Sequence, residues 1–245
     1  MKALIMAAGY AVRLYPLTKD KAKPLLPIAG KPIIEYIIDK LEAFSQIDTI
    51  YVVTNNKFYD LFVKWAKDFD YHKPIEIIND GTLTNEDRLG AIGDMHYVIK
   101  NKKIRDDLIV IAGDNLFDFD LGKLRDYAQD KKLVICAYDV KDEKLATQYG
   151  ILSVDDTGKV ISFVEKPSQP PSTLAALGIY LFKSDAVGLV DKYVRQGNNQ
   201  DAPGYFIQWV YKTENVYAYA FDGSWYDIGD LKSYEDANKV YKDNI

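Results

Sequence analysis

The sequence is poor in the residues that crosslink chains or hold zinc. Its 245 residues include one cysteine, Cys136, and two histidines, His72 and His96. A single cysteine cannot form a disulfide within the chain, and neither histidine has a cysteine or histidine partner at zinc-site spacing. Cys136 lies in an apolar run, so we expect it to be a core residue of a strand. We therefore predict neither a disulfide framework nor a zinc site.

Long apolar runs and an excess of positive charge are also missing. No run approaches the roughly 18 apolar residues of a membrane helix, and one lysine alone precedes the first apolar segment, so we predict no membrane span and no signal peptide. The net charge of −5 offers no broad basic surface, which argues against a nucleic-acid partner. These features favour a soluble, cytoplasmic protein.

What the chain has instead is the composition of an ordinary globular protein, with 48% hydrophobic and 27% charged residues. Short apolar runs alternate with segments of helical periodicity over the first half, which predicts a largely parallel sheet. One of these helices is expected to begin at Thr84 or Asn85 and to end near Ile99. The runs expected to form strands are 3–6, 48–54, 75–78, 108–112 and 133–138.

The second half changes character. The apolar segments 150–154 and 159–164 flank Asp155-Asp156-Thr157-Gly158, which is typical of a β-hairpin. Further strands are expected at 174–182 and 216–221, with a closing helix over 231–241. No repeats or linkers interrupt the chain, so we predict an α/β fold in a single domain, residues 1–245.

The most informative stretch follows the first predicted strand. Residues 6–18 read MAAGYAVRLYPLT, residues 23–27 read KPLLP and residues 30–32 read GKP. Small residues thus come directly after a buried strand, followed by a loop that holds Arg13, Lys19, Lys21 and Lys23. Of these, Arg13 and Lys23 lie within the quoted segments, and we interpret Lys19 and Lys21 as surface charges. Ligands bind at the carboxyl ends of parallel strands, and backbone N–H groups with nearby cations suit a polyphosphate.

These three segments resemble the signature of the sugar-1-phosphate nucleotidyltransferases, which reads roughly LAAGxGTRLxPLT, then KPLLP, then GKP. Ala11 and Val12 stand where the signature has glycine and threonine, and alanine adopts a positive φ only at a cost. The resemblance extends over nearly the whole chain. It implies a Rossmann-like, mixed, mostly parallel sheet with helices on both faces, a nucleotide-binding half of about 1–115 and a sugar-binding half of about 116–245.

The resemblance also implies an activity. A nucleoside monophosphate passes from a nucleoside triphosphate to a sugar 1-phosphate, pyrophosphate leaves, and a nucleotide-sugar forms, with Mg²⁺ as the cofactor. Arg13, Lys23 and Lys166 are the implied catalytic residues. The nucleotide-binding residues implied are Ala8, Gly9, Tyr10, Ala11, Val12, Arg13, Lys23, Gly81 and Arg88.

Family motifs further along the chain supply the remaining candidates. Asp114 matches the aspartate of the G-D motif and Asp227 that of W-x-D-x-G, so the resemblance assigns both to the metal. Glu165 and Lys166 match the E-K-P motif that binds the sugar and its phosphate. The sugar-phosphate-binding residues implied are Asn115, Gly150, Glu165 and Lys166.

Two other functions remain open on the sequence. A metal-dependent glycosyltransferase of the related fold would use Asp118 and Asp120, the D-x-D pair, which we otherwise interpret as polar residues at a helix start. A non-catalytic nucleotide-sugar-binding protein is the second alternative. The sequence does not identify the nucleobase, the sugar or the oligomeric state. A homodimer is compatible with the sequence, and we expect a stand-alone transferase, with dTTP, UTP or CTP and a hexose 1-phosphate as the favoured substrates.

Overall fold

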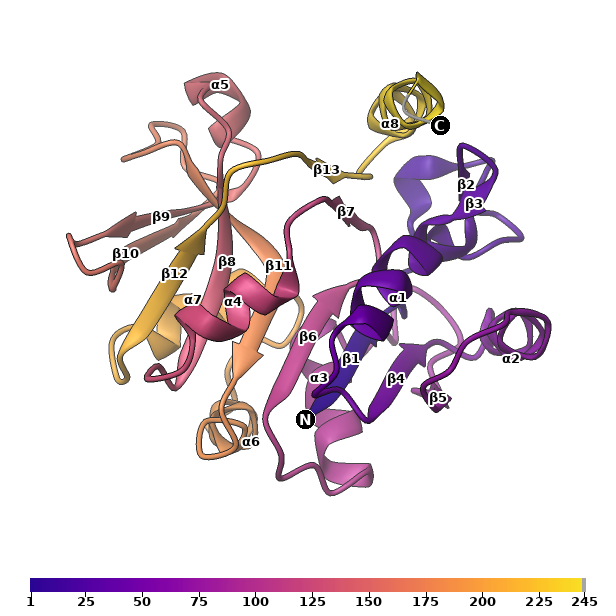
Figure 1. Ribbon diagram of the computed structural model, residues 1–245, viewed down its shortest axis with the longest axis horizontal. Coiled ribbons are helices and arrows are strands. Elements are labelled where there is room, and N and C mark those ends of the chain that lie inside the picture. Colours follow the sequence, from indigo (N-terminus) through magenta and orange to yellow (C-terminus); the bar gives the residue numbers. More distant parts are fainter. Residues whose placement is uncertain (244–245) are drawn as a thin grey trace. The chain divides into compact units, whose positions relative to one another are not determined.

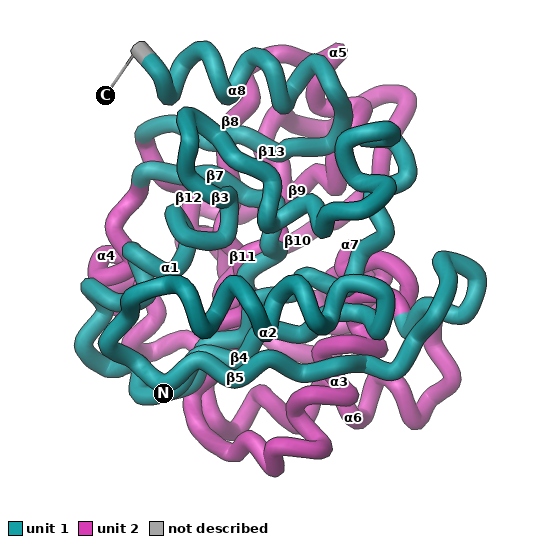
Figure 2. The backbone as a smooth tube through the Cα atoms, turned by 90° about the vertical axis from the view of Figure 1, so that its right-hand side faces the viewer, with its two compact units in different colours: residues 1–89, 111–118, 223–245 teal, residues 90–110, 119–222 magenta. Residues whose placement is uncertain are grey.

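The structure is a computed structural model that describes residues 1–243. The chain forms two compact units, each assembled from segments that are separated along the sequence (Figure 2). The first unit contains residues 1–89, 111–118 and the described part of 223–245, and the second contains 90–110 and 119–222. Each unit is therefore complete only after the chain has passed through the other unit and returned.

Three parallel strands form the sheet of the first unit: β1 (Lys2–Met6), β4 (Thr49–Thr54) and β5 (Ile75–Asn79) (Figure 1). Strand β4 is the central one, and its Val52 pairs with Ile5 on one side and Ile77 on the other. Most side chains of β1 and β4 are buried, as expected for parallel strands with apolar residues on both faces.

Helices and short strands complete the first unit. Helix α1 buries isoleucine and leucine side chains at a spacing of three and four residues, which is why this segment forms a helix packed along one face. The helices are α1 (Ile33–Ala43), α2 (Tyr59–Asp68) and α8 (Leu231–Asp243). The short strand pairs are β2 (Pro27–Ile28) with β3 (Lys31–Pro32), and β7 (Asn115–Phe117) with β13 (Trp225–Asp227).

The second unit contains a mixed sheet with the strand order β10-β9-β11-β8-β12. Only β8 and β12 are parallel to each other. The strands are β8 (Leu133–Asp139), β9 (Gly150–Val154), β10 (Val160–Glu165), β11 (Leu174–Phe182) and β12 (Val216–Ala220). Strand β6 (Leu108–Ala112) carries the chain from the second unit into the first.

Five helices of the described residues belong to the second unit. They are α3 (Ala91–Asn101), α4 (Leu121–Tyr127), α5 (Glu143–Ala146), α6 (Gly188–Arg195) and α7 (Pro203–Val210). Together with the strands, they confirm the predicted α/β class. The hairpin around 155–158 is also confirmed, because β9 and β10 pair antiparallel across it. The division into a nucleotide-binding and a sugar-binding half stays a prediction.

The helix predicted from Thr84 or Asn85 begins later than expected. Helix α3 starts at Ala91, and residues 83–88 form a loop instead. The Asp87 carboxylate accepts hydrogen bonds from the Leu83 and Thr84 amides at 3.1 and 2.8 Å, and so closes a local turn. Such side-chain bonds compete with helix formation, and the left-handed Gly90 (φ 80°) follows before the helix begins.

Cys136 is fully buried in β8, as expected for a core residue. None of the helices in residues 1–243 is long and apolar enough to span a membrane.

Candidate active site

Two residues from distant motifs, Lys23 and Asp114, meet in the first unit. Lys23 begins the short 3-10 helix η2 (Lys23–Leu25), and its Nζ donates a hydrogen bond to Asp114 Oδ2 at 2.5 Å. The same Nζ donates to the Ile228 carbonyl oxygen at 2.9 Å. One lysine thus links the KPLLP motif, the G-D motif and the W-x-D-x-G motif.

Strand pairing places Asp227 beside this lysine. Asp227 ends β13 and lies opposite Asn115, the first residue of β7, in the antiparallel register. The Ile228 amide donates to the Asp114 carbonyl oxygen at 3.3 Å, which ties the two aspartate segments together. The candidate metal ligands are therefore neighbours, although they are far apart in the sequence.

The Asp227 carboxyl carries the clearest electrostatic signal of the site. Its pKa is raised to about 6, first by burial and then by the Asp114 carboxylate, while Lys23 and Arg13 act in the opposite direction. Arg13 is close by: its Nη2 lies 4.0 Å from the position that a Cβ on Gly229 would occupy, and Asp227 Oδ2 lies 3.6 Å from it. Four charged side chains from four segments therefore act on one another here.

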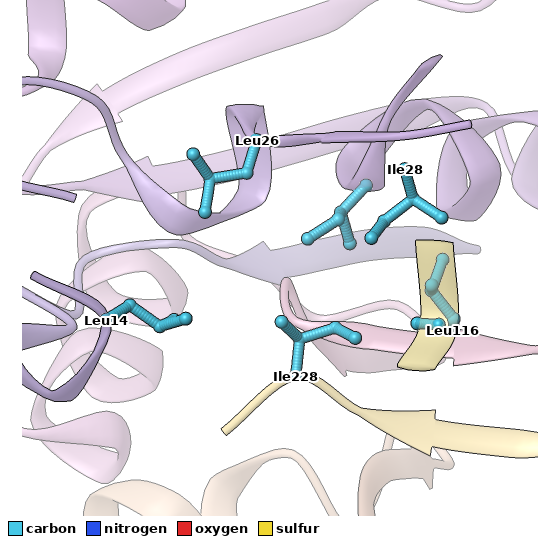
Figure 3. Close-up of a cluster of buried hydrophobic side chains, with 7 residues drawn as sticks. Leu14, Leu26, Ile28, Leu116 and Ile228 are labelled. Atoms are coloured by element: carbon cyan, nitrogen blue, oxygen red, sulfur yellow. The ribbon is translucent and has the colours of Figure 1, made fainter. Parts of the chain in front are cut away.

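A buried apolar cluster holds these segments together (Figure 3). Leu14 follows Arg13, Leu116 comes two residues after Asp114, and Ile228 follows Asp227. These side chains pack with Leu26, Ile28 and Ile33, and Ile228 and Leu116 have no exposed surface. Because each of the four charged residues lies within three positions of a cluster member, packing of the cluster fixes the positions of the charges.

The loop that follows β1 adopts a specific backbone conformation. Ala11 takes the left-handed conformation, with φ 49° and ψ 43°, at the position where the family signature has glycine. Its carbonyl accepts hydrogen bonds from the Thr18 hydroxyl at 2.7 Å and the Leu14 amide at 3.0 Å. The neighbouring Gly9 and Val12 are exposed. The loop therefore adopts a positive φ at Ala11 despite its methyl group.

A residue that sequence reasoning missed supports this loop. Asn55 is fully buried directly after β4, and its Nδ2 donates to the Ala8 carbonyl at 2.8 Å. Tyr10 is also buried, and its hydroxyl shares a hydrogen bond with Thr82 at 3.3 Å. A polar residue directly after an apolar strand is the signal that could have identified Asn55, because the carboxyl ends of parallel strands gather at one edge.

The segment predicted to lie near the base is an exposed loop. Gly81 has φ 85°, and its amide donates to Asn79 Oδ1 at 2.9 Å. Arg88 donates through Nη1 to the Asn85 carbonyl at 2.6 Å. Both residues are exposed in the first unit, the unit that also contains Arg13 and Lys23. Their contact with a nucleotide stays a prediction.

The chemistry of the donors fits a hard divalent cation. The described residues contain no group of three or more His, Cys, Asp or Glu side chains that could hold a metal, so a complete protein-built site is not present in them. Mg²⁺ typically takes one or two carboxylates together with phosphate oxygens and water. Asp114 and Asp227 supply that number, and a cation between them would offset the repulsion that raises the Asp227 pKa.

Three of the four predicted acceptor residues, Gly150, Glu165 and Lys166, lie in the second unit where β9 pairs with β10, whereas Asn115 lies in the first unit. Glu165, the last residue of β10, lies opposite Gly150, the first residue of β9. Burial raises the pKa of Glu165, and Lys166 opposes this effect. Lys166 takes the left-handed conformation with φ 45°, and its amide donates to the Tyr149 carbonyl at 3.0 Å. Such a backbone is strained for a residue other than glycine.

Asn115 is placed differently from a simple sugar ligand. It is buried, and its Oδ1 accepts a hydrogen bond from the Trp225 indole at 2.6 Å. Its Nδ2 donates to the Ala112 carbonyl at 3.3 Å and to Asp114 Oδ1 at 3.4 Å. In this arrangement Asn115 orients the Asp114 carboxylate, and its contact with a sugar stays a prediction.

The D-x-D pair has structural partners. Asp120 caps α4 by accepting a hydrogen bond from the Gly122 amide at 2.7 Å, which agrees with its interpretation as a helix-start residue. Asp118 Oδ1 accepts from the Ser224 amide at 2.9 Å. Both carboxylates are thus engaged with backbone amides, which weighs against the glycosyltransferase alternative.

Comparisons with known proteins agree with the motifs. A protein from Sulfolobus acidocaldarius, named as a candidate mannose-1-phosphate guanyltransferase, is 32% identical over 237 residues, covering 96% of this chain and 61% of its own length. The bifunctional protein GlmU of Methanocaldococcus jannaschii is 31% identical over 246 residues, covering 100% of this chain and 55% of its own. This chain thus spans a little over half the length of these curated relatives.

Among solved structures, that of a UDP-glucose pyrophosphorylase complexed with UDP-glucose superposes with a TM-score of 0.83 at 22% identity, covering 100% of this chain and 99% of the other. This similarity supports the fold predicted from the motifs, a mixed, mostly parallel sheet with helices. The sequence model of the nucleotidyl transferase family matches residues 2–244. The chain therefore belongs to the nucleotidyl transferase family, among the sugar-1-phosphate nucleotidyltransferases that its motifs indicated.

Proposed function

We propose that this chain transfers a nucleoside monophosphate from a nucleoside triphosphate to a sugar 1-phosphate, which yields a nucleotide-sugar and pyrophosphate. The observation that carries the proposal is the meeting of Lys23 with Asp114 and the Ile228 carbonyl, beside Asp227 and Arg13. A lysine on the solvated surface is not expected to bond to residues of two other family motifs, as Lys23 does. The arrangement provides two cations and two carboxylates where a triphosphate and its metal need them.

The reaction requires charge neutralisation more than a protein base. An oxygen of the sugar phosphate forms a bond to the α-phosphorus, the bond from that phosphorus to the β-phosphate bridging oxygen breaks, and the electron pair leaves on pyrophosphate. Arg13 and Lys23 bind the β- and γ-phosphates and stabilise the charge that develops there. Asp114 and Asp227 would hold Mg²⁺, which when bound neutralises phosphate charge.

The second unit supplies the residues for the acceptor. Lys166 binds the phosphate of the sugar 1-phosphate and orients its attacking oxygen. Glu165 accepts hydrogen bonds from sugar hydroxyls, and Gly150 leaves space beside its carboxylate: a Cβ there would lie 2.9 Å from Glu165 Oε2. The strained backbone at Lys166 supports a functional role, because such strain is typical of sites where a side chain must point in one direction.

The base and the sugar are the finer parts of the proposal. Arg88-Leu89 resembles the Arg-Leu pair of glucose-1-phosphate cytidylyltransferases, so we place pyrimidine nucleotides first: CTP, UTP and dTTP with a hexose 1-phosphate. One structural neighbour is complexed with UDP-glucose, which carries a pyrimidine base. One relative's name refers to a guanyl group, so purine nucleotides belong in the same test.

The experiment is a substrate matrix. Each of ATP, GTP, CTP, UTP and dTTP is incubated with each of several hexose 1-phosphates and with phosphocholine, and pyrophosphate release is recorded with Mg²⁺. We expect release that depends on a sugar 1-phosphate and is strongest for one or two bases. Release without any acceptor, or with phosphocholine alone, contradicts the proposed acceptor.

A further inference from the structure

The Glu165 carboxylate lies against two glycines of the second unit. One of them, Gly150, is its partner in the β9–β10 register. The other, Gly204, belongs to α7 and matches no family motif that we recognised. A Cβ built on Gly204 would lie 2.0 Å from Glu165 Oε2 and 2.9 Å from its carboxyl carbon. The carboxylate therefore occupies the space that any side chain at residue 204 would need.

The backbone around Gly204 has little freedom to retreat. Gly204 is the second residue of α7 and is buried. The preceding loop is fixed to the first turn of α3, because the Ala91 and Ile92 amides donate to the carbonyls of Asp201 and Gln200, each at 3.0 Å. A side chain at residue 204 would therefore displace Glu165 rather than the helix.

The carboxylate is confined on a further side by an aromatic ring. The Phe163 ring lies 3.1 Å from the Cβ position of Gly204 and 2.5 Å from that of Gly150. A side chain at either glycine would collide with both Phe163 and Glu165, so the positions of these two side chains require glycine at residues 150 and 204. Because the ring blocks one direction and the two glycine backbones bound the others, the Glu165 carboxylate is held in a narrow range of positions.

We propose that Gly204 is a positioning residue that sets where the Glu165 carboxylate meets the hydroxyls of the acceptor sugar. The inference rests on the proposed function, in which Glu165 binds the sugar. Gly204 contacts no reacting atom and acts through Glu165 alone. A carboxylate held in one place accepts hydrogen bonds only from hydroxyls of matching position and configuration, so Gly204 contributes to the choice of sugar.

The test uses Gly204→Ala, with Gly188→Ala as the matched control. Gly188 is the first residue of α6, and a Cβ there has no atom within 4 Å. Alanine is the better helix former at both positions, so helix propensity does not oppose either change. We expect Gly204→Ala to raise KM for the sugar 1-phosphate about tenfold or more, because a hydrogen bond to a charged group is displaced. KM for the nucleotide stays unchanged, and so do both constants in Gly188→Ala.

A double-variant cycle with Glu165→Ala separates positioning from a general structural effect. If Gly204 acts through Glu165, Gly204→Ala has no further effect on the sugar-phosphate KM once the carboxylate is gone. Equal effects in the presence and absence of Glu165 overturn the proposal. Should Gly204→Ala fail to fold, recovery of folding in Glu165→Ala/Gly204→Ala supports a steric collision between the side chain at residue 204 and the Glu165 carboxylate. Failure of the double variant, with Glu165→Ala folded, overturns it.

A titration distinguishes this proposal from the proposed function. If the wild type releases no pyrophosphate with any substrate pair, the proposed function fails, but the position of Glu165 can still be measured. In an NMR titration of labelled glutamate carboxyl carbons, the wild-type Glu165 pKa should lie above the ordinary range. In Gly204→Ala it should move toward about 4.3, the value of an exposed glutamate. The same pKa in both proteins overturns the positioning role.

Discussion

Single residues at this site show how unlike charges are held close together in a protein with a net charge of −5. Lys23 donates to both Asp114 and the Ile228 carbonyl, so its charge offsets a carboxylate and orients a turn at the same time. Asp227 is instead buried beside the Asp114 carboxylate, and both burial and that neighbouring charge raise its pKa. These residues make separate predictions for catalysis and for stability.

Replacing Asp114 by asparagine should abolish most of the activity while leaving the fold intact. The change keeps the side-chain shape but removes one of two charges for Mg²⁺, so we expect turnover to fall by about a hundredfold or more. Steady-state pyrophosphate release measures the effect. Asp39→Asn is the control, because Asp39 of α1 is exposed and pairs with Lys31. Near wild-type turnover in Asp114→Asn would remove this residue from the site.

The raised pKa of Asp227 predicts how stability depends on pH. A carboxyl whose pKa rises from 3.8 unfolded to about 6 folded binds protons more tightly in the folded state. Its contribution to stability is present below the unfolded pKa and is lost as pH rises through about 6. In chelator, Asp227→Asn should therefore become more stable than the wild type between pH 4 and 7, by about 3 kcal/mol at most.

Urea unfolding at several pH values in chelator measures this difference. Adding Mg²⁺ should reduce it, because an ion bound to the folded wild type stabilises the charged carboxyl pair. A stability difference that does not change between pH 4 and 7 would show that Asp227 has an ordinary pKa.

Ala11 carries a backbone cost that glycine would remove. Its φ of 49° lies in the left-handed region, which costs a residue with a Cβ about 1–2 kcal/mol. Glycine avoids this cost, but it loses more backbone entropy on folding, which cancels part of the gain. Ala11→Gly should therefore stabilise the protein by about 0.5–1 kcal/mol. Ala22→Gly is the control, because Ala22 has φ −64° and should lose stability. Thermal unfolding of the two variants compares them, and destabilisation of both would contradict the strain at Ala11.

Elements position the charges through the buried cluster of Leu14, Leu26, Ile28, Ile33, Leu116, Ile228 and Ala237 (Figure 3). Strands β7 and β13 are only three residues long, so their own hydrogen bonds cannot hold the two aspartate segments. The cluster supplies the rest of the stabilisation. This explains why a residue of the cluster lies within three positions of each charged one.

Removing part of that cluster should cost both stability and activity. Ile228→Ala should lower the free energy of unfolding by about 2–5 kcal/mol, as expected for a fully buried isoleucine. Leu231→Ala, at an exposed position of α8, should change it by less than about 0.5 kcal/mol. Urea denaturation gives both values. The idea that the cluster supports the site would be wrong if Ile228→Ala cost no more than Leu231→Ala.

The elements also show how far the sequence could predict the structure. Apolar periodicity located most strands and helices, because burial dictates that pattern directly. The start of α3 was missed because the Asp87 carboxylate closes a competing turn. The β7–β13 pair was missed because short strands joined across more than a hundred residues leave no local pattern. Motif resemblance named Lys23, Asp114 and Asp227, but only the fold shows that Lys23 bonds directly to Asp114.

At the scale of the whole molecule, the nucleotide candidates belong to the first compact unit, and the acceptor candidates other than Asn115 belong to the second (Figure 2). The first contains Arg13, Lys23, Asp114 and Asp227, and the second contains Gly150, Glu165, Lys166 and Gly204. The first set comes from all three segments of its unit, whereas the second set lies within the single segment 119–222. Changes in the first set should act mainly on the nucleotide, and changes in the second mainly on the acceptor.

The central claim, that this chain breaks the bond between the α- and β-phosphates and transfers the nucleotide, is tested most directly by following two labels. The best triphosphate and sugar 1-phosphate are incubated with the enzyme and Mg²⁺, with ³²P at either the α- or the γ-position. The account predicts that the α-label appears in the nucleotide-sugar and the γ-label in pyrophosphate, and that both appear about a hundredfold or more slowly with Asp114→Asn. A γ-label in orthophosphate or on the acceptor would contradict it.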